Sequence, residues 1–257
     1  MYWFCGVNDN SEMHKSLYIT ALKSAYKNTK LTPILLYDGN DIDFQMKVIN
    51  LNAIIINHRI SFHDKPNFIK KEEDWKNTAY GAFLRIDIPI ICKQLSIEDE
   101  YVLYTDTDVI FLNDVVDELK NYNPEYFAIC PQFNENDFIS FNSGVMLINV
   151  NNMYKTYNDF TYFMELNNYN FCSYDQGALQ TYYAFKQDKL PLYFNHKPYW
   201  NIKDNVKIIH YHGPKYDNIL NYLNNINEKV DYSGLYSMVN KNVWKYYLEL
   251  YEYYKDL

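Results

Sequence analysis

The sequence predicts an α/β fold in which a mixed, mainly parallel β-sheet is flanked by helices. Short apolar runs alternate with segments of helical spacing over the first third of the chain, as in parallel strands joined by crossover helices. The apolar run 101–104 stops at Asp106 and Asp108, and open α/β sheets place their ligands at such strand ends. Hydrophobic residues make up 48% of the chain, which excludes disordered and collagen-like classes.

The first five elements follow from spacing and turn residues. Ser11 and Glu12 offer a cap and an acidic first turn for the first helix. The dipeptide Asp38-Gly39 is typical of a turn and ends the second strand. The elements expected here are strands at 2–7, 33–37 and 53–56 and helices at 11–26 and 44–51. Their order predicts parallel strands with right-handed crossovers.

The middle of the chain contains a charged stretch followed by a helix. We interpret residues 61–77 as a solvated loop or helix face, with a mobile lid as the alternative. A helix is expected at 78–92, and Pro89 should bend it or end part of it. The other expected elements are a helix near 115–120, strands at 126–130, 141–150 and 208–210, and helices at 151–167 and 174–185.

The chain is expected to form a single domain over residues 1–257, with 218–257 as a C-terminal helical extension. Apolar and aromatic side chains recur on one stripe of a helix over 242–257. The stripe consists of Val243, Trp244, Tyr247, Leu248, Tyr251 and Tyr254. We interpret it as packing on the body of the protein, with an oligomer contact through this aromatic helix as the alternative.

Charge and hydropathy narrow the class of protein. A net charge of −8 without a basic cluster argues against nucleic-acid binding. No stretch approaches the roughly 20 apolar residues of a transmembrane helix, and the N-terminus resembles a first strand more than a signal peptide. We therefore expect a soluble cytoplasmic protein. The scattered cysteines predict buried free thiols, and they are Cys5, Cys92, Cys130 and Cys172.

Asp106 and Asp108 are candidate metal ligands. Side chains two residues apart on an extended backbone point the same way, so the two carboxylates would stand side by side. A divalent cation is the simplest relief of their repulsion, and oxygen ligands suit Mg²⁺ or Mn²⁺, which also bind phosphate oxygens. A turn with no metal explains the same spacing, with Asn113-Asp114 capping the next helix.

Five segments resemble, in order, motifs of glycosyltransferases with the GT-A fold, most closely retaining family 8. They are Arg85-Ile-Asp-Ile-Pro89, Tyr104-Thr-Asp-Thr-Asp-Val109, Phe141-Asn-Ser-Gly-Val-Met-Leu-Ile-Asn149, Tyr174-Asp-Gln-Gly-Ala-Leu179 and His210-Tyr-His-Gly-Pro-Lys215. The resemblance covers about residues 1–217 and implies the Rossmann-like fold of nucleotide-diphospho-sugar transferases. It also implies transfer of a hexose from a UDP-sugar to a glycan or other hydroxyl acceptor, with retention of anomeric configuration.

The resemblance implies that Asp106, Asp108 and His210 bind Mn²⁺ or Mg²⁺. A lone histidine is more often part of a core, but Gly213 and Lys215 favour a phosphate site here. Gly213 would let the backbone approach a phosphate closely, and Lys215 would place positive charge on the leaving diphosphate. In the family, the lysine usually comes one residue later and is followed by Pro-Trp, so the reach of Lys215 is an open point.

Arg85, Asn142 and Ser143 are implied to bind the donor substrate. Arg85 matches an arginine near the donor phosphates and sugar, although it could equally pair with Asp87 or with a motif aspartate. Asn142 and Ser143 are implied to bind sugar hydroxyls, and local bonding in a turn is the alternative.

Two further sets of residues complete the implied site. Asp175 and Gln176 match a pair beside the reacting anomeric carbon, and Asp175 would also suit the cap of a helix. The nucleotide base is expected near the end of the first strand, at Val7, Asn8 and Asp9.

Two other functions remain open from the sequence. A nucleotidyltransferase acting on a sugar phosphate could use a similar acidic metal site, although the usual Gly-rich basic loop is missing near the first strand. A catalytically silent carbohydrate-binding protein could keep the fold but would lose the metal or lysine chemistry. The segments 61–77 and 186–205 show no acceptor signature; Tyr199 and Trp200 could offer a sugar platform, and packing is the favoured interpretation.

Overall fold

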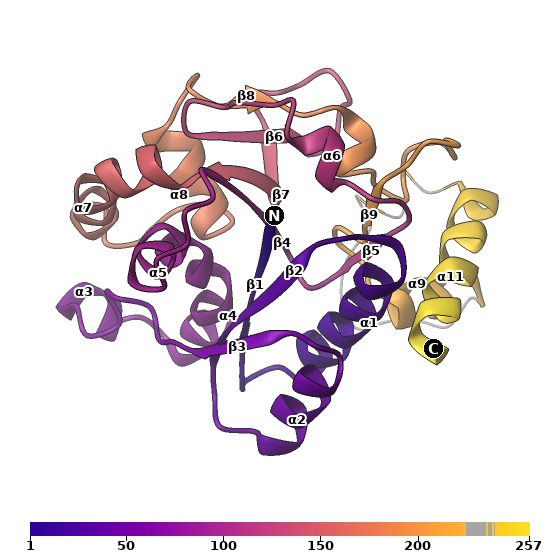
Figure 1. The fold of residues 1–257 in the computed structure, drawn as a ribbon, viewed down its shortest axis with the longest axis horizontal. Coiled ribbons are helices and arrows are strands. Elements are labelled where there is room, and N and C mark those ends of the chain that lie inside the picture. Colours follow the sequence, from indigo (N-terminus) through magenta and orange to yellow (C-terminus); the bar gives the residue numbers. More distant parts are fainter. Residues whose placement is uncertain (225–234, 236–237, 239) are drawn as a thin grey trace.

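A seven-stranded sheet forms the centre of the molecule, in the order β3-β2-β1-β4-β7-β6-β8 (Figure 1). The computed structural model describes residues 1–224, 235, 238 and 240–257. The strands are β1 (Tyr2–Asn8), β2 (Thr32–Asp38), β3 (Ile54–Asn57), β4 (Tyr101–Thr105), β6 (Phe127–Pro131), β7 (Phe141–Asn149) and β8 (Asp188–Lys189). The neighbours β3-β2-β1-β4 run parallel, whereas β7 is antiparallel to β4 and to β6. The predicted mixed, mainly parallel sheet is confirmed.

Helices cover both faces of this sheet, because neighbouring residues of each strand point to opposite sides. Trp3 and Cys5 of β1 belong to a buried cluster with residues of α1 and α2, whereas Phe4 belongs to a second cluster with residues of α4, α5, α7 and α8. The helices are α1 (Glu12–Asn28), α2 (Ile42–Asn50), α3 (Pro66–Ile69), α4 (Glu73–Phe83), α5 (Ile88–Gln94), α6 (Val116–Leu119), α7 (Val150–Leu166), α8 (Asp175–Tyr182), α9 (Tyr216–Leu223) and α11 (Lys241–Asp256), with 3-10 turns η1 (Leu84–Asp87) and η2 (Leu192–Phe194).

A second, two-stranded sheet carries two of the candidate metal ligands. β5 (Val109–Phe111) pairs antiparallel with β9 (Ile208–His210), and Val109 lies opposite His210. Asp108 directly precedes β5, and Asp106 directly follows β4 of the large sheet. The two sheets therefore meet at the Asp-x-Asp segment.

The helix expected at 78–92 is wrong in its bounds. α4 already begins at Glu73, η1 interrupts the segment, and a new helix α5 contains Pro89 in its first turn. Proline lacks the N–H that a helix interior needs, but it fits a first turn, where that group has no helical partner.

The interpretation of residues 61–77 as a solvated loop or helix face is wrong for two aromatic residues of this stretch, and the lid alternative is not supported. Phe62 and Phe68 are fully buried in the core under α4, so this stretch is anchored to the body. Polar residues between them hide this signal in the sequence. Tyr199 and Trp200 are likewise buried. This confirms the favoured interpretation that they pack within the protein and do not form a platform for a sugar.

The aromatic stripe of α11 packs on the body, as predicted. All six of its residues are buried in a cluster that also contains Leu17 of α1 and Ile219 of α9. This face is therefore used within the chain, and an oligomer contact through it is not supported. The division of the chain into one domain with an extension at 218–257 stays a prediction.

All four cysteines are free thiols, as predicted. Cys172 is exposed, however, so the expectation of burial is wrong for that residue. Cys172 lies in a loop before α8, where flanking aromatic residues made the sequence look like core.

Among the described residues, no helix combines the length and hydrophobicity that a transmembrane segment requires.

Candidate active site

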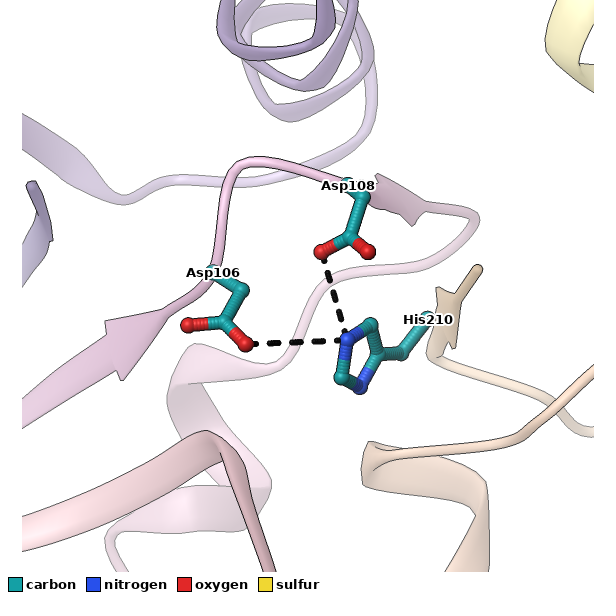
Figure 2. Close-up of side chains that lie close together, drawn as sticks. All are labelled: Asp106, Asp108 and His210. Atoms are coloured by element: carbon teal, nitrogen blue, oxygen red, sulfur yellow. Dashed lines mark ion pairs between the residues drawn. The ribbon is translucent and has the colours of Figure 1, made fainter. Parts of the chain in front are cut away.

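Asp106, Asp108 and His210 lie together where the two sheets meet (Figure 2). His210 Nε2 lies 3.2 Å from Asp108 Oδ1 and 3.7 Å from Asp106 Oδ2. One ligand atom from each residue lies within 4.8 Å of the others. We call these three residues the metal cluster, because two carboxylates and an imidazole suit a divalent cation.

Each carboxylate of the metal cluster has a cationic partner from the protein. Arg85 Nη2 donates to Asp106 Oδ1 at 2.7 Å, and the Lys215 ammonium forms an ion pair with Asp108. Burial alone would raise the pKa of Asp108, but the neighbouring Lys215 and His210 side chains outweigh it and hold that pKa well below its usual range. The repulsion expected from the sequence is therefore already offset by these two side chains.

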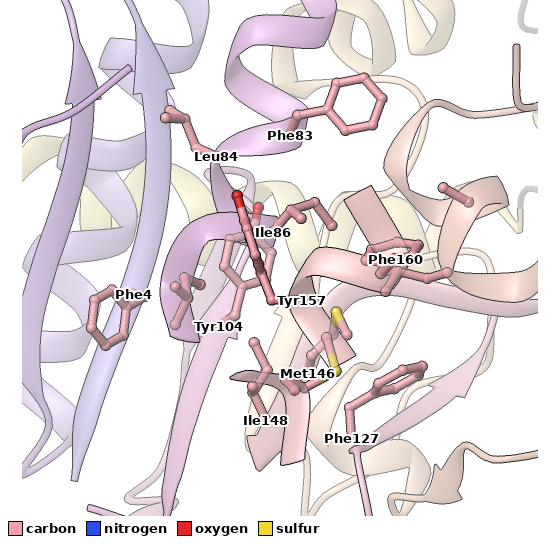
Figure 3. Close-up of a cluster of buried hydrophobic side chains, with 14 of the residues drawn as sticks. Phe4, Phe83, Leu84, Ile86, Tyr104, Phe127, Met146, Ile148, Tyr157 and Phe160 are labelled. Atoms are coloured by element: carbon pink, nitrogen blue, oxygen red, sulfur yellow. The ribbon is translucent and has the colours of Figure 1, made fainter. Parts of the chain in front are cut away.

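Arg85 connects the metal cluster to the predicted sugar-binding residues. Its flanking residues Leu84 and Ile86 are buried in the core cluster that Figure 3 shows, which fixes η1 against the sheet. Arg85 Nε lies 2.9 Å from Asp175 Oδ2, and Arg85 Nη1 donates to Ser143 Oγ at 3.0 Å.

The alternative partner Asp87 bonds to His58 Nε2 at 2.8 Å instead. The sequence had left open whether Arg85 pairs with Asp87 or with a motif aspartate, and the structure shows the latter.

Asp175 is a buried carboxylate whose pKa is shifted upward. Burial raises the pKa of Asp175 to about 6, although the charge of Arg85 lowers it. Arg85 shares its charge between Asp175 and Asp106, so neither carboxylate has the guanidinium to itself. Asp175 is the first residue of α8, and the cap position is held by Tyr174.

Replacing Asp175 with asparagine is expected to stabilise the protein most above pH 6. The folded-state pKa of about 6 exceeds the unfolded value of about 3.9, so the folded state binds more protons between these values. This contribution to stability is complete below about pH 4 and is lost as the pH rises through 6, at a cost on the order of 3 kcal/mol.

Thermal unfolding of wild type and Asp175→Asn in EDTA, from pH 4 to 8, checks this dependence. The melting temperature of Asp175→Asn minus that of wild type should increase as the pH rises. Asp159→Asn, at an exposed site, should follow the wild type. A constant difference between Asp175→Asn and wild type across this range would contradict the assignment.

Gly144 shows how closely the backbone approaches the metal cluster. A Cβ added to Gly144 would lie 2.1 Å from His210 Cε1 and 2.8 Å from Asp106 Oδ2. The backbone N–H of Asp106 also donates to Gly144 O at 2.8 Å. The cluster therefore sits against a strand that has no side chain at this point, and the donor set fits Mn²⁺ or Mg²⁺.

A cavity of about 420 Å³ opens over the metal cluster. This volume is within the range of about 300–1,000 Å³ that is usual for small-molecule sites. The predicted site residues in its lining are Val7, Asn8, Arg85, Asp106, Asp108, His210 and Lys215. His14 and Thr107 also line it and lie within hydrogen-bond distance of each other, with 2.8 Å between Nδ1 and Oγ1.

Six predicted site residues are absent from this lining, and Asp9 and Gly213 are two of them. Asp9 lines a neighbouring cavity of about 400 Å³, where its carboxylate pairs with Lys15 at 3.2 Å. Gly213 has a φ of +89°, and an added Cβ would lie 2.2 Å from Leu235 Cδ1, so packing within the chain also requires glycine there.

The predicted sugar-binding amides are buried behind Arg85. Gln176 Oε1 accepts hydrogen bonds from Asn142 Nδ2 at 3.2 Å and from the Ser143 N–H at 3.0 Å. Asn142 Oδ1 accepts from Asn195 Nδ2 at 3.0 Å. The structure thus brings Asn142, Ser143, Asp175 and Gln176 together beside the metal cluster.

Sequence reasoning missed three contributors to the site. Gly144 was within a recognised motif but was given no role, although a glycine next to two polar motif residues could have suggested a close approach. Asn195 and His14 stand outside every motif that was recognised, and the sequence offered no signal for either.

The mixed sheet, with an acidic pair where it meets a two-stranded sheet, is the GT-A fold. Solved structures of three glycosyltransferases are similar to this chain. The galactosyltransferase LgtC, in complex with donor and acceptor sugar analogs, has a TM-score of 0.61 at 16% identity, covering 83% of this chain and 88% of LgtC. GlyE of Streptococcus pneumoniae TIGR4 has a TM-score of 0.65 at 17% identity, covering 99% of this chain and 62% of GlyE.

The third is mouse xyloside xylosyltransferase 1, with a TM-score of 0.57 at 14% identity, covering 82% of this chain and 97% of the mouse protein. No protein-family model and no curated protein matches the chain. At these identities the similarity establishes the fold, and the predicted GT-A fold is confirmed.

Proposed function

We propose that this protein is a metal-dependent glycosyltransferase that moves a hexose from a UDP-sugar to a glycan or other hydroxyl acceptor. The observation that carries this proposal is the metal cluster at the base of a cavity whose wall also holds Arg85 and Lys215. A site with carboxylates, an imidazole and two cationic side chains suits a divalent cation together with a diphosphate.

Different side chains of the site are proposed to hold the cation, to stabilise the diphosphate and to contact the base. A divalent cation held by the metal cluster would supply Lewis-acid charge to a departing diphosphate. Lys215 Nζ lies at Asp108 on the cavity wall, where it would meet the same diphosphate and stabilise its developing charge. Val7 and Asn8 also line the cavity and are the proposed contacts of the uracil base.

The donor sugar is proposed to lie against the amides behind Arg85. Asn142 and Ser143 would bind its hydroxyl groups, and Asp175 and Gln176 would lie beside the anomeric carbon as the catalytic residues. Retention of anomeric configuration rests on the resemblance to family 8 motifs.

Thermal unfolding with nucleotides, with and without Mn²⁺ or Mg²⁺, tests the proposal. UDP at about 100 times its dissociation constant should stabilise the fold by about 2.7 kcal/mol, or roughly 5–10 °C, and only when the cation is present. The UDP-sugar series then identifies the donor, and NMR of the product identifies its anomer.

Other outcomes of these measurements would contradict the proposal or indicate a different function. A shift with UDP that ignores the cation, or no nucleotide shift, would overturn the metal–diphosphate site. Stabilisation by free sugar without a cation would indicate a carbohydrate-binding protein, and pyrophosphate release from a nucleoside triphosphate and a sugar phosphate would indicate a nucleotidyltransferase.

A further inference from the structure

A chain of buried amides connects the metal ligand His210 to the proposed sugar-binding residues. Asn195 is fully buried, with its Oδ1 3.0 Å from His210 Nδ1 and its Nδ2 3.0 Å from Asn142 Oδ1. Asn142 Nδ2 in turn donates to Gln176 Oε1 at 3.2 Å. The metal ligand and the sugar-binding amides are thus linked through one residue, Asn195.

Backbone donors determine the direction of every hydrogen bond in this chain. The Ser143 N–H donates to Gln176 Oε1 at 3.0 Å, and the Gly144 N–H donates to Asn142 Oδ1 at 3.2 Å. A backbone N–H can only donate, so the atoms that it meets must be the amide oxygens of the two side chains.

The orientation of the Asn142 amide in turn determines the orientation of the Asn195 amide and the nitrogen of His210 that carries a proton. Because Asn142 presents its oxygen, Asn195 must present its NH₂ group there, and its own oxygen faces the imidazole. His210 must then carry a proton on Nδ1, and in the neutral ring the lone pair is on Nε2. Nε2 is the nitrogen that faces Asp106 and Asp108.

We propose that Asn195 is a positioning residue that holds His210 in the Nδ1–H tautomer, with Nε2 free to bind the cation. The consequence for catalysis rests on the proposed function, but the tautomer itself does not. Partners of a metal-binding histidine fix its tautomer and ring orientation, and their loss typically weakens metal binding about 10–100-fold.

The backbone holds Asn195 firmly enough for this role. The His196 N–H donates to Ile208 O at 2.9 Å, and the His210 N–H donates to His196 O at 2.8 Å. The buried Lys197 ammonium donates to Asn195 O at 2.9 Å and to Pro131 O at 3.0 Å. Asn195 and His210 therefore belong to one hydrogen-bonded unit with the ends of β9 and β6.

Long-range ¹H–¹⁵N NMR of the histidine rings tests the tautomer in metal-free wild-type protein, at a pH where the ring is neutral. His210→Gln identifies the His210 signals by their loss. We expect the proton on Nδ1; a neutral ring with its proton on Nε2 would overturn the inference. The tautomer itself is read in the wild-type protein and needs no activity, so the result stands even if the proposed function fails.

Three variants test whether Asn195 determines the tautomer of His210. Asn195→Ala should leave a mixture of tautomers and weaken Mn²⁺ binding, measured by electron paramagnetic resonance, about 10–100-fold. Asn195→Asp keeps an oxygen for the His210 N–H and should restore the tautomer. Asn149→Ala removes another buried amide, which bonds to Pro124 O at 3.1 Å and caps α7, and should change neither readout.

The inference is overturned if folded Asn195→Ala keeps both the wild-type tautomer and the wild-type Mn²⁺ affinity. If wild type shows the Nδ1–H tautomer but binds no divalent cation, the proposed function fails while the role of Asn195 in setting the tautomer remains supported.

Discussion

Gly144→Ala is expected to abolish binding of Mn²⁺ and, with it, cation-dependent binding of UDP. The new methyl group would lie 2.1 Å from His210 Cε1, which is far inside any tolerable contact. His210 cannot turn away cheaply, because its ring is fully buried and its Nδ1 is bonded to Asn195. The methyl group must therefore displace the imidazole or move β7 away from β9.

The size of this effect follows from the two ways in which the site can respond. Losing an outer partner of a metal ligand costs about 10–100-fold in affinity, so displacing the ligand itself should cost at least about 100-fold. Crowding in the core should also lower stability by about 1–3 kcal/mol. Isothermal titration with Mn²⁺ measures the first effect, and thermal unfolding measures the second.

Gly81→Ala is the matched control, because it adds the same methyl group in the lining of the cavity that the metal cluster also lines. There the nearest atom to the added Cβ is the Asn8 side chain at 3.9 Å, and no atom of the metal cluster lies within contact. Its affinity for Mn²⁺ alone should equal that of wild type. A folded Gly144→Ala protein that also binds Mn²⁺ like wild type would show that the cation does not bind at the metal cluster.

Asp108→Asn should remove cation-dependent transfer while leaving the protein folded. The carboxylate is buried between His210 and Lys215, and asparagine keeps its shape without its charge. An amide oxygen is a much weaker ligand for a hard cation than a carboxylate, so Mn²⁺ affinity should fall by at least about 100-fold. Lys215 loses its partner but is 18% exposed, and its ammonium can turn toward water.

Transfer from a UDP-sugar and Mn²⁺ titration together check this expectation. Asp117→Asn, at an exposed position in the first turn of α6, is the control and should behave as wild type in both assays. Full transfer activity in Asp108→Asn would disprove the proposed site.

Local patterns in the sequence were enough to predict the sheet and to place Asp106 and Asp108 together at the end of a strand. The apolar run before Asp106 marks a strand end, and strand ends of a parallel sheet converge on one edge. His210 came from motif resemblance, and the structure pairs its strand with the one that follows Asp108. These inferences succeeded because each depends on a few adjacent residues.

The parts that the sequence did not reveal depend on contacts between distant segments. Asn195 acts through its bonds to Asn142 and His210, and neither bond leaves a trace in the residues around it. The break of the helix at η1 has the same origin, since it buries Arg85 between Asp106 and Ser143. Helical spacing alone cannot foresee such a requirement.

The ion pairs of Arg85 and Lys215 with the metal cluster have a consequence for how a cation enters. Because Asp106 and Asp108 already have counterions within the chain, the fold does not depend on an ion to hold two carboxylates together. Loading of the site by a divalent cation would therefore be an exchange, in which the cation would take the place of the Lys215 ammonium at Asp108. The released charge lies on the cavity wall, so an arriving diphosphate would be the next partner of Lys215, and cation and nucleotide should each strengthen the binding of the other.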